Sequence, residues 1–200
     1  KVAYEKKGSV FFSIDKFSNY GQLSGKNIKD LISGHRVNIN PHKQNPIDFI
    51  LWKPSNHDEP GWKSPWGIGR PGWHIECSVM SNSLLGDQID IHGGGMDLIF
   101  PHHENEIAQS QSRSGKFFSK FWVHNNFIKF DDQKMSKSLG NIIKARDFIT
   151  DYSPEILKFI ILSVHYRSPL NFNYNTIKQS IVGLIRIYSA LDFANKFVNK

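Results

Sequence analysis

Apolar positions with helical spacing run over residues 73–85. Ile75, Val79, Met80 and Leu84 fall on one side of a helix with 3.6 residues per turn. This spacing predicts a helix over the segment. Residues 88–92 instead alternate between apolar and polar side chains, which predicts a strand that stops at Gly93.

Five further segments have the pattern of a strand or a helix. The strands are expected in residues 48–52, as a buried run, and within residues 117–130; the helices are expected in residues 101–111, from residue 154 onward, and over residues 175–200. Ser153, Pro154 and Glu155 form a favourable helix start, with a capping hydroxyl, a proline in the first turn and an early acid.

Residues 53–72 are rich in proline and glycine. Proline lacks a backbone donor and glycine has little conformational preference, so we expect no regular structure here. Trp62, Trp66 and Trp73 lie in or next to the segment, and large apolar rings are unusual in a solvated linker. We therefore expect these rings to pack against the protein.

Composition permits a sizeable core. The chain has 200 residues, 39% of them hydrophobic, which suits one domain or one domain plus the start of another. Its 25 Lys and Arg against 18 Asp and Glu give a net charge of +7. A basic excess favours a polyanionic partner, although many soluble proteins are mildly basic without one.

Cysteine use and the chain start indicate a cytoplasmic protein. Cys77 is the only cysteine, which excludes an intrachain disulfide and favours a reducing compartment. No apolar run approaches the roughly 18 to 20 residues that a membrane helix needs, so we expect no membrane partner. The chain opens at Lys1 without an initiator Met or a signal sequence, and we interpret it as an internal piece of a longer protein.

A polar, cationic stretch covers residues 131–141. Lys134 and Lys137 are three residues apart among small hydroxyl residues, and Gly140 and Asn141 close the stretch. Ammonium groups on such a loop can close over a triphosphate and neutralise charge as pyrophosphate leaves. A solvated basic turn is the alternative for a generic loop of this composition.

Consecutive glycines follow the strand predicted at residues 88–92. Glycines at the end of a strand let a ligand approach the backbone closely, as nucleotide-binding turns do. A simple tight turn would explain the same glycines. We assign Gly94, Gly95 and Asp97 as candidate ATP-binding residues.

One combination of residues suits a metal ion. His102 and Glu106 are four apart and would project from one face of the predicted helix. With the Cys77 thiolate they offer sulfur, nitrogen and oxygen ligands, a set that suits zinc. The alternatives are a cysteine buried as a small hydrophobe and a surface hydrogen bond between His and Glu.

Four motifs follow one another along the chain. They are Gly-Trp-His-Ile-Glu-Cys-Ser at 72–78, His-Gly-Gly-Gly at 92–95, Phe-Pro-His-His-Glu-Asn-Glu at 100–106 and Lys-Met-Ser-Lys-Ser at 134–138. The last is similar to the signature loop of class I aminoacyl-tRNA synthetases. In this order, the four resemble the cysteinyl-tRNA synthetase family within that class, and the likeness covers nearly the whole chain.

The resemblance implies roles for particular residues. Cys77, His102 and Glu106 match the family's zinc ligands, which a further cysteine nearer the amino terminus completes, with one zinc per subunit. Trp73 and His92 match residues that line the amino-acid pocket. Lys137 would contact ATP, which is used with magnesium, and we assign Lys134 and Lys137 as the catalytic pair.

Two parts of the family pattern do not occur in these residues. The family's other ATP motif, His-Ile-Gly-His or a close variant, is missing, and so is the additional zinc cysteine. The resemblance places both upstream of Lys1 and an anticodon-binding region beyond the carboxyl end. On this interpretation the 200 residues hold the second half of an active site.

The implied fold is α/β, a partial Rossmann-type class I catalytic domain with a connective insertion and the start of a helical domain. The expected parts are the end of the insertion (1–64), the closing half of the Rossmann-type domain (65–95), the segment with the lysine loop (96–174) and the first helix of a tRNA-binding domain (175–200).

The implied reaction joins cysteine to tRNA(Cys) in two steps, through cysteinyl-adenylate, and a monomer is expected. A related ligase that passes activated cysteine to an amino sugar would share the zinc site and the lysine loop. A non-catalytic fragment that binds RNA is the third alternative. Basic residues in the last predicted helix, among them Lys178 and Arg186, favour tRNA weakly.

Overall fold

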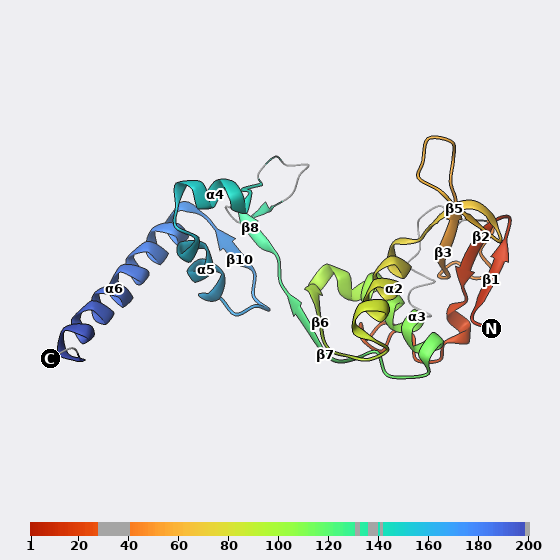
Figure 1. The fold of residues 1–200 in the computed structure, drawn as a ribbon, viewed down its shortest axis with the longest axis horizontal. Helices are drawn as coiled ribbons and strands as arrows, with labels where there is room; N and C mark the ends of the chain where they lie inside the picture. Colours follow the sequence, from red (N-terminus) through yellow and green to blue (C-terminus); the bar gives the residue numbers. More distant parts are fainter. Residues whose placement is uncertain (28–40, 131–132, 136–139, 141, 199–200) are drawn as a thin grey trace. The chain divides into compact units, whose positions relative to one another are not determined.

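The computed structural model describes residues 1–27, 41–130, 133–135, 140 and 142–198. The chain forms two compact units, Lys1–Val123 and His124–Lys200 (Figure 1). Both combine helices with strands, which confirms the predicted α/β class. Within the described ranges, no helix has the length and apolar character needed to cross a membrane.

A five-stranded antiparallel sheet forms the amino-terminal part of the first unit. Its order is β1 (Ala3–Lys6), β2 (Ser9–Phe12), β3 (Phe49–Pro54), β5 (Gly67–Pro71) and β4 (Trp62–Ser64). Lys7 and Gly8 both have positive φ, as a two-residue hairpin turn between β1 and β2 requires. Residues 48–52 were expected to contain a buried strand; β3 confirms the strand at the centre of the sheet, although only Phe49 of β3 is fully buried.

The prediction that residues 53–72 hold no regular structure is wrong, because β4 and β5 lie within them. Proline is tolerated where a strand begins or ends, and Pro54 and Pro71 are the last residues of β3 and β5. Gly69 is required by close packing, since a Cβ there would lie 2.5 Å from Trp52 Nε1. The breaker residues therefore mark the ends and the tight spots of a hairpin.

The tryptophans of this hairpin are more exposed than predicted. Trp62 and Trp66 were expected to pack against the protein, but they remain 59% and 44% exposed. Trp66 contacts only part of the Trp52 ring, with centroids 6.2 Å apart and a tilt of 56°. A strand at the edge of a sheet has an open side, and β4 holds that edge position.

Helices and a second small sheet complete the first unit. α2 (Trp73–Leu85) has the predicted bounds, and β6 (Ile89–Gly95) pairs with β7 (Ser119–Asn125). The prediction that this strand stops at Gly93 is wrong, because β6 continues through Gly95. Short turns η2 (Met96–Leu98) and η3 (Ile99–His103) lead into α3 (Glu104–Ser114).

The core of the first unit is organised by α3. Ala108 is fully buried in a cluster with Phe12 and Phe49 of the five-stranded sheet. Its neighbour Ile107 belongs to a second cluster, with Ile89 of β6 and Phe118. Because α3 contributes to both clusters, it packs against the large sheet and against the β6–β7 pair. This packing holds the first turn of α3 in place.

The second unit is built around one apolar cluster. β8 (Ile128–Phe130) lies between the parallel β10 (Leu170–Phe172) and the antiparallel β9 (Gln133–Lys134). α4 (Ala145–Asp151) and α5 (Pro154–Leu162) pack beside them, and Phe148, Ile160, Leu170, Phe172 and Ile177 form the buried core. As predicted, α5 starts after Ser153, whose side chain accepts a hydrogen bond from the Glu155 N–H.

The last helix is α6 (Tyr174–Val198), close to the predicted 175–200. Its start packs through Ile177 and Ile181 against the cluster of the second unit. Its carboxyl-terminal half extends beyond α5 and β10 in Figure 1, and Ile185, Tyr188 and Leu191 are each at least half exposed there.

Candidate metal and substrate site

Four elements of the first unit bring aromatic and titratable side chains together. α2 carries Trp73, His74 and Cys77 near its amino end. The η3 turn carries His102 and the first turn of α3 carries Glu106. β6 adds His92. Residues separated by up to 33 positions in the sequence thus meet at the amino-terminal ends of two packed helices.

The first turn of α3 is anchored by a loop from the start of the chain. Glu104 is fully buried, and its carboxylate accepts the Ser24 N–H at 2.9 Å. The Tyr20 hydroxyl donates to Asn105 Oδ1. These bonds hold Glu104 and Asn105, the two residues before Glu106, in place. The backbone position of Glu106 is therefore fixed.

The predicted metal trio is close together in the structure. One ligand atom each of Cys77, His102 and Glu106 lie within 4.8 Å of one another. His102 Nε2 is 3.0 Å from Glu106 Oε1, in agreement with the spacing of four residues. The trio was predicted from residue types, and the fold now provides the proximity.

Glu106 also belongs to a second group. His92, His103 and Glu106 offer ligand atoms within the same 4.8 Å, and His92 Nε2 is 2.9 Å from Glu106 Oε2. That contact lacks hydrogen-bond geometry, and Oε2 is a buried oxygen without a hydrogen bond among the described residues. The Glu106 carboxylate is only 1% exposed, and it offers an oxygen to each of the two groups. Its buried Oε2 atom accepts no hydrogen bond from the described residues, which is unusual for a buried polar atom.

Aromatic rings enclose the trio on one side. The Trp73 ring stacks on His102, with centroids 4.4 Å apart and planes inclined by 20°. His74 Nδ1 lies 2.8 Å from His102 Nδ1, so one of the two imidazoles donates to the other. Trp73 keeps 58% of its surface exposed and can meet a ligand on its open face.

Burial favours the neutral forms of the imidazoles. It lowers the pKa of His74 to about 4, and the neighbouring His102 adds to this lowering. Burial also lowers the pKa of His102, against the opposing effect of the Glu106 carboxylate. Neutral imidazole is the form that coordinates a metal ion.

The Cys77 thiol is shifted in the other direction. Burial raises the pKa of this thiol, and the Glu106 carboxylate raises it further. The protein alone therefore holds Cys77 as a thiol. Since a metal ligand must be a thiolate, a bound cation would have to displace this proton.

The donor set fits zinc. Sulfur, imidazole nitrogen and carboxylate oxygen are its ordinary ligands, and catalytic zinc sites commonly use three protein ligands with one open position. The short separations and the carboxylate oxygen without a hydrogen bond are the structural observations that agree with a cation here. Calcium or magnesium would favour more oxygen ligands than this group supplies.

The glycines of the candidate ATP site pack closely against site residues. A Cβ at Gly94 would lie 2.7 Å from the His103 ring, and one at Gly95 would lie 2.5 Å from Asp97 Oδ1. The space beside these glycines is therefore occupied by side chains of the protein itself, His103 and Asp97. Their predicted contact with ATP remains a prediction.

The lysine loop lies in the second unit. Lys134 is in β9, where the backbone pairs with Lys129. Lys137 lies outside the described residues. The predicted catalytic role of both lysines remains a prediction.

Two site residues were missed by the sequence analysis, His74 and His103. His74 is three residues before Cys77, which places both on one face of α2 and was a usable signal. His103 gave no such signal, because adjacent residues of a helix face different directions. Its place beside His92 depends on the path of β6, which the sequence pattern does not reveal.

Comparisons with known proteins agree on one family. The model of the catalytic domain of class I (C) tRNA synthetases matches residues 1–182. A cysteine–tRNA ligase from Bdellovibrio bacteriovorus is 56% identical over 99% of this chain, and one from Clostridioides difficile is 56% identical over 94%. A third, from Lachnoclostridium phytofermentans, is 55% identical over 95%.

The match covers only part of each relative. The chain spans 41% of the length of the Bdellovibrio protein and 40% of the other two. The likeness thus describes less than half of those proteins, although it takes in nearly every residue of this chain.

Proposed function

The chain belongs to the catalytic-domain family of class I (C) tRNA synthetases, and from this premise we propose that the whole protein is a cysteine–tRNA ligase. The observation that carries the proposal is the trio of Cys77, His102 and Glu106 within 4.8 Å, next to the open face of Trp73. We place the protein in the cytoplasm as a monomer.

The proposed reaction has two steps. An oxygen of the cysteine carboxylate attacks the α-phosphorus of ATP, and pyrophosphate leaves as the bond to the β-phosphate oxygen breaks. The terminal ribose hydroxyl of tRNA(Cys) then attacks the adenylate carbonyl, loses its proton, and AMP leaves. The products are cysteinyl-tRNA, AMP and pyrophosphate.

Selection of cysteine over serine is the demanding part of this function. The two amino acids differ by one atom, and a hydrophobic pocket rejects such an isostere poorly. A zinc ion held by Cys77, His102 and Glu106 would supply a soft Lewis acid, which prefers a thiolate to a hydroxyl that stays protonated. Discrimination would then need no editing site.

The chain's own residues would position the substrates. Trp73 and His92 would line the amino-acid pocket; the exposed face of Trp73 and the low exposure of His92 beside Glu106 support this. Lys134 and Lys137 would neutralise charge on the phosphates, together with magnesium, as pyrophosphate leaves. Gly94, Gly95 and Asp97 would contact ATP.

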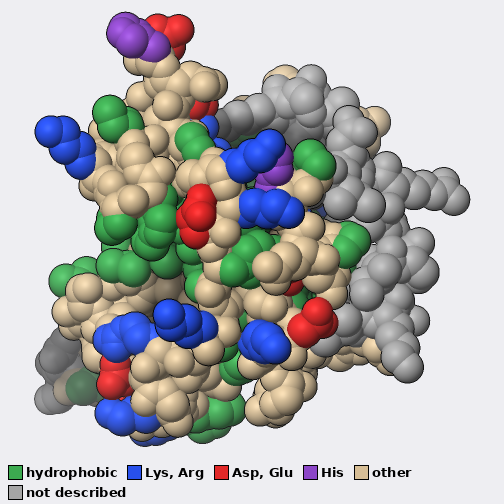
Figure 2. Space-filling view, turned by 90° about the vertical axis from the view of Figure 1, so that its right-hand side faces the viewer, with side chains coloured by type: hydrophobic (Ala, Val, Ile, Leu, Met, Phe, Trp, Pro, Cys, Tyr) green, Lys and Arg blue, Asp and Glu red, His purple; other side chains and the backbone are tan. Residues whose placement is uncertain are grey.

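Charge supports a nucleic-acid partner in a general way. The net charge of +7 suits tRNA, since neutralised phosphates release counterions. On the face drawn in Figure 2, Lys and Arg side chains are spread over several places, with Asp and Glu between them. Lys178 and Arg186 line a shallow groove on α6 and are candidates for tRNA contact.

Two assays test the proposal in the whole protein. Exchange of labelled pyrophosphate into ATP should depend on cysteine and should be far weaker with serine. The preformed adenylate should then transfer to tRNA(Cys) and not to an amino sugar. Transfer to an amino sugar alone would identify the related ligase, and tRNA binding without exchange would identify a non-catalytic RNA-binding protein.

A further inference from the structure

Three polar contacts connect α2 with η3 and α3. His74 Nδ1 meets His102 Nδ1 at 2.8 Å, the Ser78 hydroxyl donates to Gln109 Oε1, and Arg113 donates to Asn82 Oδ1. The contacts follow the same order along both segments. His74, Ser78 and Asn82 are four residues apart, so the contacts lie along one face of α2.

His102 of the candidate metal trio makes the first contact, and Cys77 and Glu106 lie between the first two contacts along the sequence. Cys77 directly precedes Ser78, and Gln109 comes three residues after Glu106, about one turn later on α3. The separation and register of the two helices at Ser78 and Gln109 therefore determine how far Cys77 Sγ lies from Glu106 and His102.

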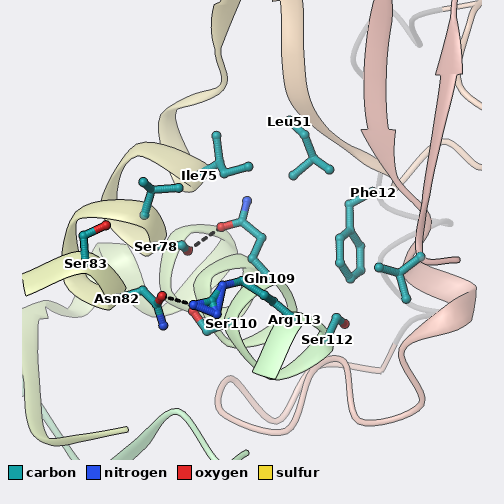
Figure 3. Close-up of a pocket in the computed structure, with 12 residues that line it drawn as sticks. Phe12, Leu51, Ile75, Ser78, Asn82, Ser83, Gln109, Ser110, Ser112 and Arg113 are labelled. Atoms are coloured by element: carbon teal, nitrogen blue, oxygen red, sulfur yellow. Dashed lines mark hydrogen bonds between the residues drawn. The ribbon is translucent and has the colours of Figure 1, made fainter. Parts of the chain in front are cut away.

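The contact between Ser78 and Gln109 is the most buried one that α2 makes with α3 itself. Ser78 is 6% exposed and Gln109 is 9% exposed, whereas the Arg113 side chain is largely in solvent. A buried hydrogen bond has no competing water and holds its partners more firmly than an exposed one. Figure 3 shows the Ser78 and Gln109 side chains directed at each other from neighbouring helices.

On one side of Ser78 and Gln109, side-chain packing contributes little to holding α2 and α3 at a fixed separation. A cavity of about 420 Å³ lies beside Ser78 and Gln109, with Phe12, Leu51 and Ile75 in its wall. Gln109 Nε2 has no hydrogen-bond partner among the described residues. Because this space leaves room on one side of the helices, the bond from Ser78 is a buried restraint on their separation, in addition to the contacts made by His74 and Asn82.

We propose that Ser78 and Gln109 are positioning residues, whose mutual hydrogen bond sets the distance between α2 and α3 at which Cys77, His102 and Glu106 bind one metal ion. The inference rests on the proposed zinc site. It assigns no contact with substrate or metal to Ser78 or Gln109, which act through the helices that carry the ligands.

The test measures metal affinity in the whole protein, with Co²⁺ as a spectroscopic probe and Zn²⁺ in competition with a chromophoric chelator. Ser78→Ala removes the donor and Gln109→Met removes the acceptor at similar side-chain length. Each should weaken Zn²⁺ binding by roughly 10- to 100-fold, the usual effect of losing a partner that orients metal ligands. The thiolate-to-Co²⁺ absorption band should weaken or shift in both.

Matched variants separate positioning from general destabilisation. Ser81→Ala deletes a buried hydroxyl of the same helix that has no hydrogen-bond partner among the described residues, and it should leave Zn²⁺ affinity unchanged. Ser78→Thr keeps the hydroxyl and adds one methyl group at a residue that lines the cavity, and it should retain the affinity of the unchanged protein. The double variant Ser78→Ala/Gln109→Met should bind Zn²⁺ no more weakly than the single variant with the lower affinity, because all three variants lose the same hydrogen bond.

The outcomes are distinct. Co²⁺ and Zn²⁺ binding in the unchanged protein, lost in Ser78→Ala and Gln109→Met and retained in Ser81→Ala and Ser78→Thr, supports the inference. Normal affinity in both disrupting variants, or an equal loss in Ser81→Ala, overturns it and leaves the zinc site standing. No metal binding in the unchanged protein overturns the zinc site and the positioning role together.

Discussion

Glu106 is the residue of the candidate site whose buried charge a cation would compensate. Its carboxylate is almost completely buried, and burying such a group is costly unless charges or hydrogen bonds compensate. His102 and His92 approach its two oxygens at 3.0 and 2.9 Å, but burial keeps the pKa of His102 low. A bound divalent ion would supply the missing positive charge.

The first prediction concerns the ligands themselves. In the whole protein, Cys77→Ala or His102→Ala should remove most of the zinc, because each deletes one of the proposed ligands. Glu106→Gln should be milder, since the amide oxygen can still coordinate weakly. Elemental analysis of purified variants, with about one zinc expected per unchanged active site, measures this. Full zinc occupancy in Cys77→Ala would exclude the assignment.

The second prediction concerns Lys137, which lies outside the described residues. In the whole protein, Lys137→Ala should slow cysteine-dependent pyrophosphate exchange by roughly 100- to 1,000-fold, because the ammonium group stabilises charge that develops on the phosphates. Cysteine binding alone should change little. Lys129→Ala, on β8 outside the loop, serves as the control.

A small effect would count against this role. If exchange falls by less than about threefold, the loop takes no part in the chemical step, since a contact with developing charge has a larger effect. Lys134→Ala should also slow exchange, and comparison of the two variants identifies the lysine with the larger role.

At the scale of elements, regular periodicity predicted well. α2 has the expected bounds, and α5 starts at its capping serine, because both depend on local spacing and backbone donors. The β4–β5 hairpin was missed, because proline is tolerated at strand ends and glycine is tolerated inside a strand where a neighbouring side chain packs closely. Here they lie at strand ends or opposite a tryptophan, positions that only pairing with β3 defines.

Only some residues of the site were predicted, because the others depend on contacts between elements. Cys77, His102 and Glu106 carry chemistry in their residue types, so they could be selected without knowing the fold. The contribution of His103 depends on β6 passing beside η3, and that of Ser78 depends on the packing of α2 on α3. Contacts between elements distant in sequence leave no periodic signal.

The third prediction tests the start of α5. The Ser153 side chain accepts the Glu155 N–H at 3.2 Å, and Ile160 of the same helix is fully buried in the core of the second unit. Ser153→Ala should lower the free energy of unfolding by about 1 kcal/mol, the usual effect of losing an N-cap. Denaturant unfolding followed by circular dichroism measures the change.

A matched variant decides whether the cap is responsible. Ser153→Asp keeps an oxygen acceptor at the same position, so it should unfold close to the unchanged protein. Equal destabilisation of the Ala and Asp variants would show that Ser153 stabilises the unit by something other than capping.

At the scale of the molecule, two helices each present several exposed apolar side chains. On α2, Leu84 is 82% exposed, and Val79, Met80 and Leu85 are each more than half exposed. α6 presents a similar series from Ile185 onward. Single exposed apolar residues are normal, but contiguous groups of them mark surfaces that contact another protein segment.

The last prediction concerns a polypeptide limited to these 200 residues. It should catalyse neither cysteine-dependent pyrophosphate exchange nor aminoacylation, because its sequence contains no His-x-Gly-His string to complete the ATP site that the family uses.

The exposed faces of α2 and α6 should make the 200-residue polypeptide self-associate, which light scattering after size-exclusion chromatography would show. It should also bind zinc more weakly than the whole protein, since ligands need a preorganised fold. The control adds, as a separate polypeptide, the part of the Bdellovibrio relative that this chain does not match, and it tests whether the 200 residues are correctly folded. Cysteine-dependent exchange by the 200 residues alone would show that these residues contain a complete active site.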